Sequence, residues 1–201
     1  MRKISISFIV LITTAIQVCS QPCPATEIRA VWLTTNYNLD WPKNKLSVDA
    51  QKNELVQLLD ELKNLNFNMV LFQTRTNGEV LYRSQIEPMY RSIAKNYGGE
   101  AFDPLAFVVE ECHKRGMECH AWLITYPLGS RNHVKNLGNA SVVKKHPQLV
   151  TFYKNQWYLD PGNPKTDDYL LSIVKEIVTT YDVDGIHFDY IRYPDSSHCF
   201  C

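Results

Sequence analysis

Apolar residues recur along this chain with two different periods, and the two periods alternate. A period of two is typical of a strand, and a period of 3.6 is typical of an amphipathic helix. The expected strands are residues 28–35, 69–75, 117–125 and 185–193, and the expected helices are 48–68, 103–116 and 165–183. This order of strand and helix predicts a βα repeat and therefore a parallel sheet.

The helix boundaries carry recognisable signals. Within residues 48–68, leucines recur at steps of three and four: Leu55, Leu58, Leu59, Leu62 and Leu65. The next helix has Asp103 as an N-cap, Pro104 at its first position and Gly116 just after its end. These signals fix the helical segments more firmly than periodicity alone.

A doubly wound sheet and a (β/α)₈ TIM barrel both fit the βα order. The stretch WLTTNYN after the first strand has no glycine-rich phosphate loop, which counts against a dinucleotide fold. A complete barrel takes about 250 residues, whereas this chain has 201 and stops just after its fourth expected strand. The sequence therefore predicts the N-terminal half of a TIM barrel, with about four βα units. Residues 126–164 form a long excursion that includes a hairpin, VTFYKNQWYL.

The first twenty residues have the pattern of a signal peptide. Arg2 and Lys3 precede an apolar run, and Ser20 is a small residue at the expected cut. The expected organisation is a signal peptide at 1–20, a linker at 21–26 and a TIM-barrel domain at 27–201, incomplete at its C-terminus. Export to the periplasm or the extracellular space is the prediction. A membrane anchor fits less well because the run is short, and lipid attachment to the outer membrane through Cys19 is the second alternative.

Composition narrows the possible partners. The formal net charge is zero, so nothing indicates a nucleic-acid or anionic-membrane partner. The six cysteines, at positions 19, 23, 112, 119, 199 and 201, form no disulfide framework. Cys112 and Cys119 each precede a histidine, but their places on a helix and on an apolar strand face favour ordinary buried thiols over a metal site. No cofactor or metal is expected.

One face of the expected sheet collects polar and aromatic side chains. Alternation sorts the residues of every strand into two sets, one for each face of the sheet. The mainly apolar set can pack against helices. The other set points toward the barrel axis: Trp32, Thr34, Gln73, Arg75, His120, Trp122, His187 and Asp189. Barrel enzymes build their sites where the strands end. A buried hydrogen-bond network in which Arg75 neutralises Asp189 is the alternative, but it leaves the tryptophans unexplained.

These residue types suit a carbohydrate. Indole and phenol faces stack on sugar rings, and glycoside cleavage commonly uses two carboxyl groups. Asp189 is the predicted catalytic carboxylate, kept ionised by Arg75 or His187. Asp160 and Glu79 are candidates for the second carboxyl group, although solvated loop positions are the simpler interpretation of both. Within the excursion, Tyr153, Trp157 and Tyr158 are candidates to line a saccharide subsite, or they pack the loop against the barrel mouth.

Several blocks in order resemble the glycosyl hydrolase-like 10 family. They are EIRAVWLT, FNMVLFQTR, YRSQIEP, FDPLAFVVEECHKRGMECHAW, HPQLV, WYLDPGNP and VDGIHFDYIRYP, and they span nearly all of residues 27–195. The resemblance implies an exported, often lipid-anchored TIM-barrel glycoside hydrolase. One branch of that family cleaves peptidoglycan glycan strands stripped of their peptides. By motif, FQTR implies Gln73 and Arg75 in the site, and HFDYIRYP implies His187, Asp189, Tyr190 and Arg192.

Two other functions remain open at this point. A metal-dependent hydrolase or deacetylase would use His120, His187 and Asp189, although the first strand lacks the H-x-H pair of many metallo-barrels. A noncatalytic carbohydrate-binding protein would hold a glycan and be indifferent to the loss of the Asp189 carboxylate. The predicted substrate-binding residues are Trp32, Gln73, His120, Trp122, Tyr190, Arg192 and Trp157.

Overall fold

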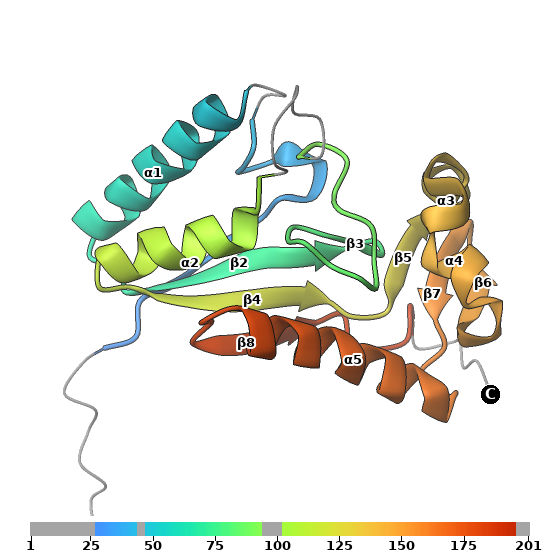
Figure 1. Cartoon of the computed structure of the whole chain (residues 1–201). Helices are drawn as coiled ribbons and strands as arrows, with labels where there is room; N and C mark the ends of the chain where they lie inside the picture. The colour runs from blue at the N-terminus through green and yellow to red at the C-terminus, as the bar shows by residue number, and fades with distance from the viewer. Residues whose placement is uncertain (1–26, 44–46, 94–101, 196–201) are drawn as a thin grey trace, which may run out of the picture.

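The computed structural model describes residues 27–43, 47–93 and 102–195, and its centre is a parallel sheet. The strand order is β1-β2-β4-β8, and every neighbouring pair is parallel (Figure 1). The bounds are Ala30–Leu33 for β1, Met69–Thr76 for β2, Glu118–Ile124 for β4 and Gly185–Asp189 for β8. The parallel α/β architecture predicted from the βα repeat is therefore confirmed.

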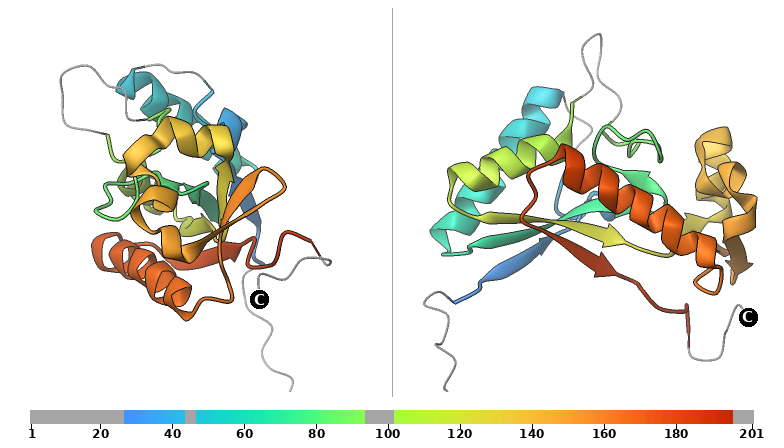
Figure 2. Two further views of the ribbon diagram at one scale, coloured as in Figure 1. Left: turned by 90° about the vertical axis from the view of Figure 1, so that its right-hand side faces the viewer. Right: turned by 60° about the horizontal axis from the view of Figure 1, so that its bottom comes forward.

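Three long helices connect these strands and lie along the sheet (Figures 1 and 2). They are α1 at Val48–Asn64, α2 at Pro104–Lys114 and α5 at Pro164–Thr180. Ser47 and Asp103 cap the first two helices, and Asn163 caps α5. The predicted cap at Asp103 is confirmed, and Gly116 has a φ of +61°, which ends α2 in the left-handed region that favours glycine.

The core lies between the helices and one face of the sheet. Alternate strand residues are fully buried there, and leucine and isoleucine side chains of the three helices pack on them. The buried strand residues are Leu33, Val70, Phe72, Cys119, Ala121 and Leu123. These residues are the mainly apolar set that was expected to face the helices. Cys112 and Cys119 are buried thiols, as predicted.

The excursion between β4 and α5 forms a second, antiparallel sheet of order β5-β7-β6. It stands beyond the end to which the arrowheads of β2 and β4 point, together with two short helices (Figure 1). The bounds are Pro127–Ser130 for β5, Arg131–Leu137 for α3, Val142–Lys145 for α4, Val150–Tyr153 for β6 and Gln156–Leu159 for β7. Lys154 and Asn155 turn the predicted hairpin with positive φ values.

The first and last expected strands are longer than the real ones, and the short strands β3 and β5 were not expected. The first strand covers only Ala30–Leu33, and the last ends at Asp189 because Tyr190 has a φ of 52° and cannot continue an extended strand. A two-residue strand, β3 at Glu79–Val80, pairs antiparallel with β2.

The predicted signal peptide, the linker, and Cys19, Cys23, Cys199 and Cys201 lie outside the described residues. Within the described ranges, no helix has the length and apolar character needed to cross a membrane.

Candidate active site

The ends of the four parallel strands meet around one cavity of about 360 Å³, here called the Asp189 cavity. Each strand or the residue just beyond it contributes to the lining. The contributors are Thr34, Gln73, Thr76, Trp122, Ile124 and Asp189, joined by Asn36, Leu39, Asn77, Pro127 and Tyr190 from the following loops. Ligand sites of parallel α/β proteins commonly lie at this edge of the sheet.

Asp189 is held by two hydrogen bonds. The indole Nε1 of Trp122 donates to Oδ2 at 3.1 Å, and the backbone N–H of Tyr190 donates to Oδ1 at 2.7 Å. A carboxylate offers about four acceptor positions, so both oxygens retain room for a ligand. Tyr190 has a φ of 52°, and strained backbone of this kind concentrates at functional sites.

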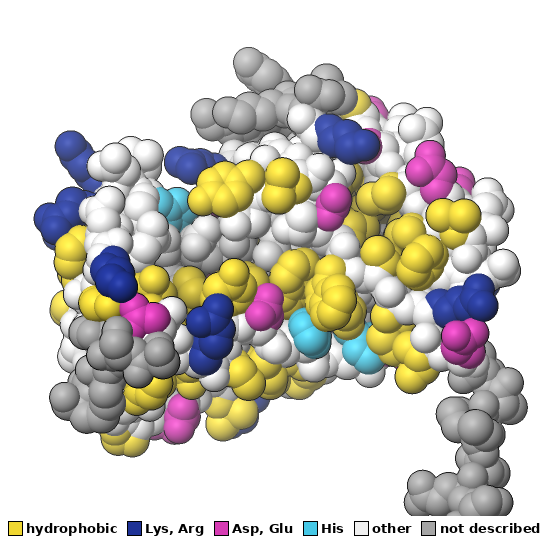
Figure 3. Space-filling view, turned by 180° about the vertical axis from the view of Figure 1, so that it is seen from behind, with side chains coloured by type: hydrophobic (Ala, Val, Ile, Leu, Met, Phe, Trp, Pro, Cys, Tyr) yellow, Lys and Arg dark blue, Asp and Glu magenta, His cyan; other side chains and the backbone are white. Residues whose placement is uncertain are grey.

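An aromatic cluster lies beside Asp189 on the same face of the sheet. Trp32 Nε1 donates to Nε2 of His187 at 3.2 Å, and the His187 ring lies 6.5 Å from the Trp122 ring. As an acceptor, Nε2 of His187 carries no proton, which places the ring proton on Nδ1. Trp32 is 58% exposed. Hydrophobic side chains form a band across the face seen in Figure 3, with histidine side chains among them.

The Trp32–His187 contact also describes the shape of the sheet. β1 and β8 are the two ends of the strand order, with β2 and β4 between them. Neighbouring strands lie about 4.8 Å apart, so a flat sheet would hold β1 and β8 roughly 14 Å from each other. The side-chain contact between them agrees with a sheet that curls toward this face.

Gln73 lies in the wall of the Asp189 cavity, but its side-chain oxygen already accepts hydrogen bonds from other residues of the protein. Oε1 accepts from Thr34 Oγ1 at 2.9 Å, from Thr35 N at 2.9 Å and from Asn36 N at 2.7 Å. Gln73 therefore holds the loop after β1 against β2. Only its Nε2 group remains to meet a ligand.

Arg75 does not lie where the alternation predicted. The register of β2 against β4 shifts between Gln73 and Arg75, which turns the arginine toward α5. Its Nε and Nη2 donate to Glu87 at 2.8 and 2.6 Å, and Nη1 donates to the carbonyls of Ile124 and Thr125.

Arg75 and Glu87 form a fully buried ion pair. Burial acts to lower the pKa of Arg75, but the charge of Glu87 and the hydrogen bonds to it outweigh burial and raise the pKa. Tyr169 of α5 donates to the same Glu87 at 2.8 Å. The prediction that Arg75 lies beside Asp189, as a supporting or a neutralising group, is therefore wrong, because its guanidinium is committed to Glu87.

His120 faces the same side of the sheet as Trp122 but lies nearer the start of β4. Its Nε2 lies 3.0 Å from Glu118 Oε2, and its ring packs so closely on Gly185 that a Cβ there would come within 2.5 Å. His120 is not part of the Asp189 cavity wall. In the described part of the chain, no group of three or more His, Cys, Asp and Glu side chains is placed to hold a metal. The trio required by the metal-dependent alternative is thus not assembled.

The remaining predicted binding residues lie at different distances from the site. Tyr190 lines the Asp189 cavity, and the guanidinium of Arg192 lies 5.2 Å over its ring. Trp157 lies in β7 of the second sheet, where it packs on Phe152 at 4.9 Å and borders a separate groove with α3 and α4. Trp157 therefore lies outside the Asp189 cavity, and its predicted role in a saccharide subsite stays a prediction.

The two candidates for a second carboxyl group also differ from expectation. Asp160 belongs to the turn before α5, where Oδ1 accepts from Gly162 N at 2.9 Å, as its simpler interpretation predicted. Glu79 is not a solvated loop residue: it lies in β3 and is fully buried. Its Oε1 accepts from Arg91 N at 3.1 Å, and its Oε2 lies 3.5 Å from His133 Nε2 without a hydrogen bond.

The sequence reasoning missed several residues of this region. Asn36 and Asn77 line the Asp189 cavity, and Glu87 is the buried partner of Arg75. Asn77 precedes Gly78 directly after β2, and an Asn-Gly pair is a turn signal that could have indicated a loop at the strand end. Nothing in the local sequence distinguishes Glu87 as a buried acid.

Comparisons with known proteins agree with this architecture. The model of a family described as "Glycosyl hydrolase-like 10" matches residues 27–199. Glycosyl hydrolase YngK of Bacillus subtilis (strain 168) is 36% identical over 202 residues, an alignment that covers 96% of this chain and 39% of that protein. Glycosyl hydrolase DigH of Escherichia coli (strain K12) is 35% identical over 201 residues, covering 90% of this chain and 44% of that protein. The chain therefore spans less than half the length of these two relatives.

Solved structures support the fold alone. The α-L-fucosidase isoenzyme 2 of Paenibacillus thiaminolyticus superposes with a TM-score of 0.55 at 18% identity, covering 87% of this chain and 25% of that chain. The noncanonic maltogenic α-amylase AmyB of Thermotoga neapolitana superposes with a TM-score of 0.51 at 16% identity, covering 84% of this chain and 39% of that chain. Both likenesses agree with the described parallel α/β fold.

Proposed function

Because the chain belongs to the glycosyl hydrolase-like 10 family, we propose that it forms the first half of a barrel glycoside hydrolase in which Asp189 is a catalytic carboxylate. The observation that carries this proposal is the placement of Asp189. It ends β8, lines the cavity at the strand ends and is oriented by Trp122. Its role is that of a nucleophile or of a negatively charged group that stabilises an oxocarbenium-like transition state.

The rest of the cavity supports a sugar ligand. Trp122 and Tyr190 offer aromatic surfaces next to the carboxylate, and the side chains of Asn36 and Asn77 offer donors and acceptors for hydroxyl groups. His187 is a positioning residue in this proposal, because the Trp32 hydrogen bond fixes its ring beside Trp122. The proposed substrate is a polysaccharide or a peptidoglycan-type glycan. The sequence features of residues 1–20 support export, with lipid attachment at Cys19 as the less favoured alternative.

The exposed side of β8 supports completion of the barrel by further βα units. An apolar groove of about 700 Å³ runs between α5 and β8 and includes Leu171, Phe188 and Ile191, which are 49%, 44% and 59% exposed. A fifth parallel strand beside β8, followed by a helix beside α5, would cover this groove. The two relatives are more than twice the length of the aligned region. We assign the second carboxyl group to a strand of that further region, because Glu79 is buried and Asp160 forms a turn.

The direct test compares Asp189→Asn with the wild type in a full-length form that carries the rest of the barrel. Release of reducing ends from purified glycan strands and from a panel of polysaccharides gives the rate. The proposal expects turnover to fall by roughly 10³-fold or more while glycan binding persists. Asp49→Asn, a matched change at an exposed position in the first turn of α1, should leave the rate unchanged. Wild-type turnover by Asp189→Asn would refute the assignment, and binding without any turnover in either protein would favour a noncatalytic glycan-binding role.

A further inference from the structure

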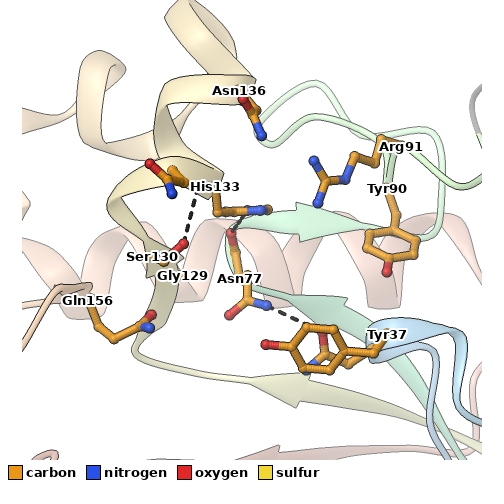
Figure 4. Close-up of a pocket in the computed structure, with 11 residues that line it drawn as sticks. Tyr37, Asn77, Tyr90, Arg91, Gly129, Ser130, His133, Asn136 and Gln156 are labelled. Carbon is orange, nitrogen blue, oxygen red and sulfur yellow. Dashed lines mark hydrogen bonds between the residues drawn. The ribbon is translucent and has the colours of Figure 1, made fainter.

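A second cavity adjoins the Asp189 cavity at the same end of the sheet. It holds about 240 Å³, room for one sugar ring, and is here called the polar cleft (Figure 4). Its lining comes from the loop after β1, the β2–β3 turn, the segment after β3, and the excursion. The lining residues include Asn36, Tyr37, Asn77, Arg91, His133 and Asn136.

The two cavities share a wall. Asn36 and Asn77 line both of them, and Asn77 Nδ2 lies 3.4 Å from Asn36 Oδ1. A chain of sugars that has one unit against Asp189 can therefore place a neighbouring unit in the polar cleft. The cleft is suited to be a subsite of the same groove.

The polar cleft has the side chains that sugar binding requires. Five amide side chains line it, and each amide offers both donors and acceptors to hydroxyl or acetamido groups. Tyr37 is 81% exposed and stands at its edge (Figure 4). Tyr37 and Asn77 have φ values of 55° and 52°, an uncommon conformation for residues other than glycine. The fold thus holds an exposed phenol ring and an amide in place at some conformational cost.

Arg91 is the one charged side chain among the residues that line the cleft. It points toward His133 and Asn136 in Figure 4, and its guanidinium forms no ion pair with another described residue. His133 does not add charge, because burial lowers its pKa and its Nε2 lies 3.0 Å from the carbonyl oxygen of Asn77. The cleft therefore presents a cation to a ligand, without an acidic side chain in its lining.

The nearby acid does not cancel this cation. Glu79 lies behind the cleft wall, where its Oε1 accepts from the backbone of Arg91 rather than from the guanidinium. Burial raises the pKa of Glu79 to about 7, although the backbone and the charge of Arg91 both act to lower it. Glu79 therefore carries only part of a negative charge near neutral pH.

We propose that the polar cleft is a subsite for a sugar unit that carries a carboxylate, which Arg91 binds, next to the sugar unit held at Asp189. The proposal deepens the glycan-cleaving function and rests on it for the neighbouring unit. It specifies an acidic glycan as the substrate class. Tyr37 stacks on the ring, the amides bind its neutral substituents, and Arg91 supplies the charge-assisted hydrogen bonds.

The test measures binding in the Asp189→Asn background, so that no probe is cleaved. Two matched pairs of probes place the carboxylate at different ring positions: methyl glucuronide with methyl glucoside, and N-acetylmuramic acid with N-acetylglucosamine. Titration calorimetry or NMR titration gives the dissociation constants. In at least one pair the acidic sugar should bind tenfold or more tightly than its neutral partner, because a hydrogen bond to a charged group is worth a factor of about ten to a hundred.

Variants then assign the preference to the cleft. Arg91→Gln should remove the preference for the acid, whereas Lys175→Gln, the same charge change on the exposed face of α5, should keep it. Tyr37→Asn, which tolerates the positive φ, should weaken both members of a pair by a similar factor. Equal binding within both pairs, or a preference that survives Arg91→Gln, would overturn the proposal. If the preference holds but Asp189→Asn retains full turnover, the catalytic assignment fails and the subsite stands; the reverse result leaves the catalytic assignment and removes the subsite.

Discussion

Trp122 Nε1 donates a 3.1 Å hydrogen bond to Asp189 Oδ2, and this contact joins the ends of β4 and β8. The hydrogen bond fixes one carboxylate oxygen and thereby sets the direction in which the other faces the cavity. Trp122 is therefore both an aromatic surface and an orienting donor for the proposed catalytic group.

Replacement of Trp122 by phenylalanine should separate these two roles. The ring remains, but the N–H donor to Asp189 is lost. Since a hydrogen bond to a charged group is worth about 1.5 to 3 kcal/mol, kcat should fall roughly ten- to a hundredfold, with a much smaller change in KM. Steady-state kinetics in the full-length form provide the measurement, and a change in KM alone would show that Trp122 only binds substrate.

Because Arg75 and Glu87 form a buried ion pair, replacement of Arg75 should lower the stability of the protein rather than specifically lower its catalytic rate. Arg75→Met leaves the Glu87 carboxylate buried and without its cation, and removing one partner of a buried pair costs about 3 to 5 kcal/mol. Urea denaturation followed by circular dichroism measures the free energy of unfolding. The exposed Arg29–Glu27 pair is the control, because Arg29→Gln should cost less than about 1 kcal/mol. An Arg75→Met protein as stable as the wild type would contradict the structural role.

The buried carboxyl group of Glu79 should make the free energy of unfolding depend on pH. Its folded-state pKa of about 7 lies above the ordinary value of 4.5, because it is buried without a cation on Oε2. The folded state thus holds the proton more tightly than the unfolded state. This stabilising effect is complete below about pH 4.5 and is lost as the pH rises through 7, with a total of about 3 kcal/mol.

Glu79→Gln should remove that dependence, since the amide is neutral at every pH and keeps the Oε1 acceptor for Arg91 N. The variant and the wild type should have similar melting temperatures at pH 5, and the variant should melt higher at pH 8. The other charged and titratable groups near Glu79 are the same in the variant and in the wild type. They are Arg91, His133, Tyr90 and Glu87. Parallel stability curves for the two proteins across this range would contradict the assigned ionisation of Glu79.

The apolar groove between α5 and β8 predicts self-association of the 201-residue chain. Leu171 and Phe188 are half exposed there, and β8 has a free edge within the described sheet. Open edges beside apolar surface favour pairing with another chain. Sedimentation velocity should show concentration-dependent association, which the double variant Leu171→Lys, Phe188→Lys should reduce. A wild-type chain that stays monomeric across the concentration range would contradict this prediction and remove one support for the proposed further βα units.

Most of the sheet could be predicted because a parallel strand has a strict period of two. That period places Trp32, Gln73, Trp122, His187 and Asp189 on one face, where the structure also has them. The same rule failed for Arg75, since a register shift after Gln73 reverses the face of every later residue in β2. Such an irregularity depends on strand pairing and leaves no trace in the local sequence.

Other parts of the site depend on contacts between distant segments. His120 lies on the predicted face of the sheet, but periodicity does not give its position along the strand direction. It lies near the start of β4, beside Glu118 and Gly185. Trp157 has a suitable side chain, but the second sheet directs it to another groove. Glu79 follows an Asn-Gly turn that suggests solvent, yet β2, α3 and the segment after β3 enclose it.

The central claim is that Asp189 attacks or stabilises the anomeric centre of a glycan bound at the strand ends. A crystal structure of the full-length Asp189→Asn protein with an oligosaccharide tests this claim most directly. The predicted result is an anomeric carbon about 3 to 3.5 Å from the side chain of residue 189, with a ring against Trp122. A glycan seated elsewhere, with residue 189 touching only Trp122 and Tyr190, would contradict it.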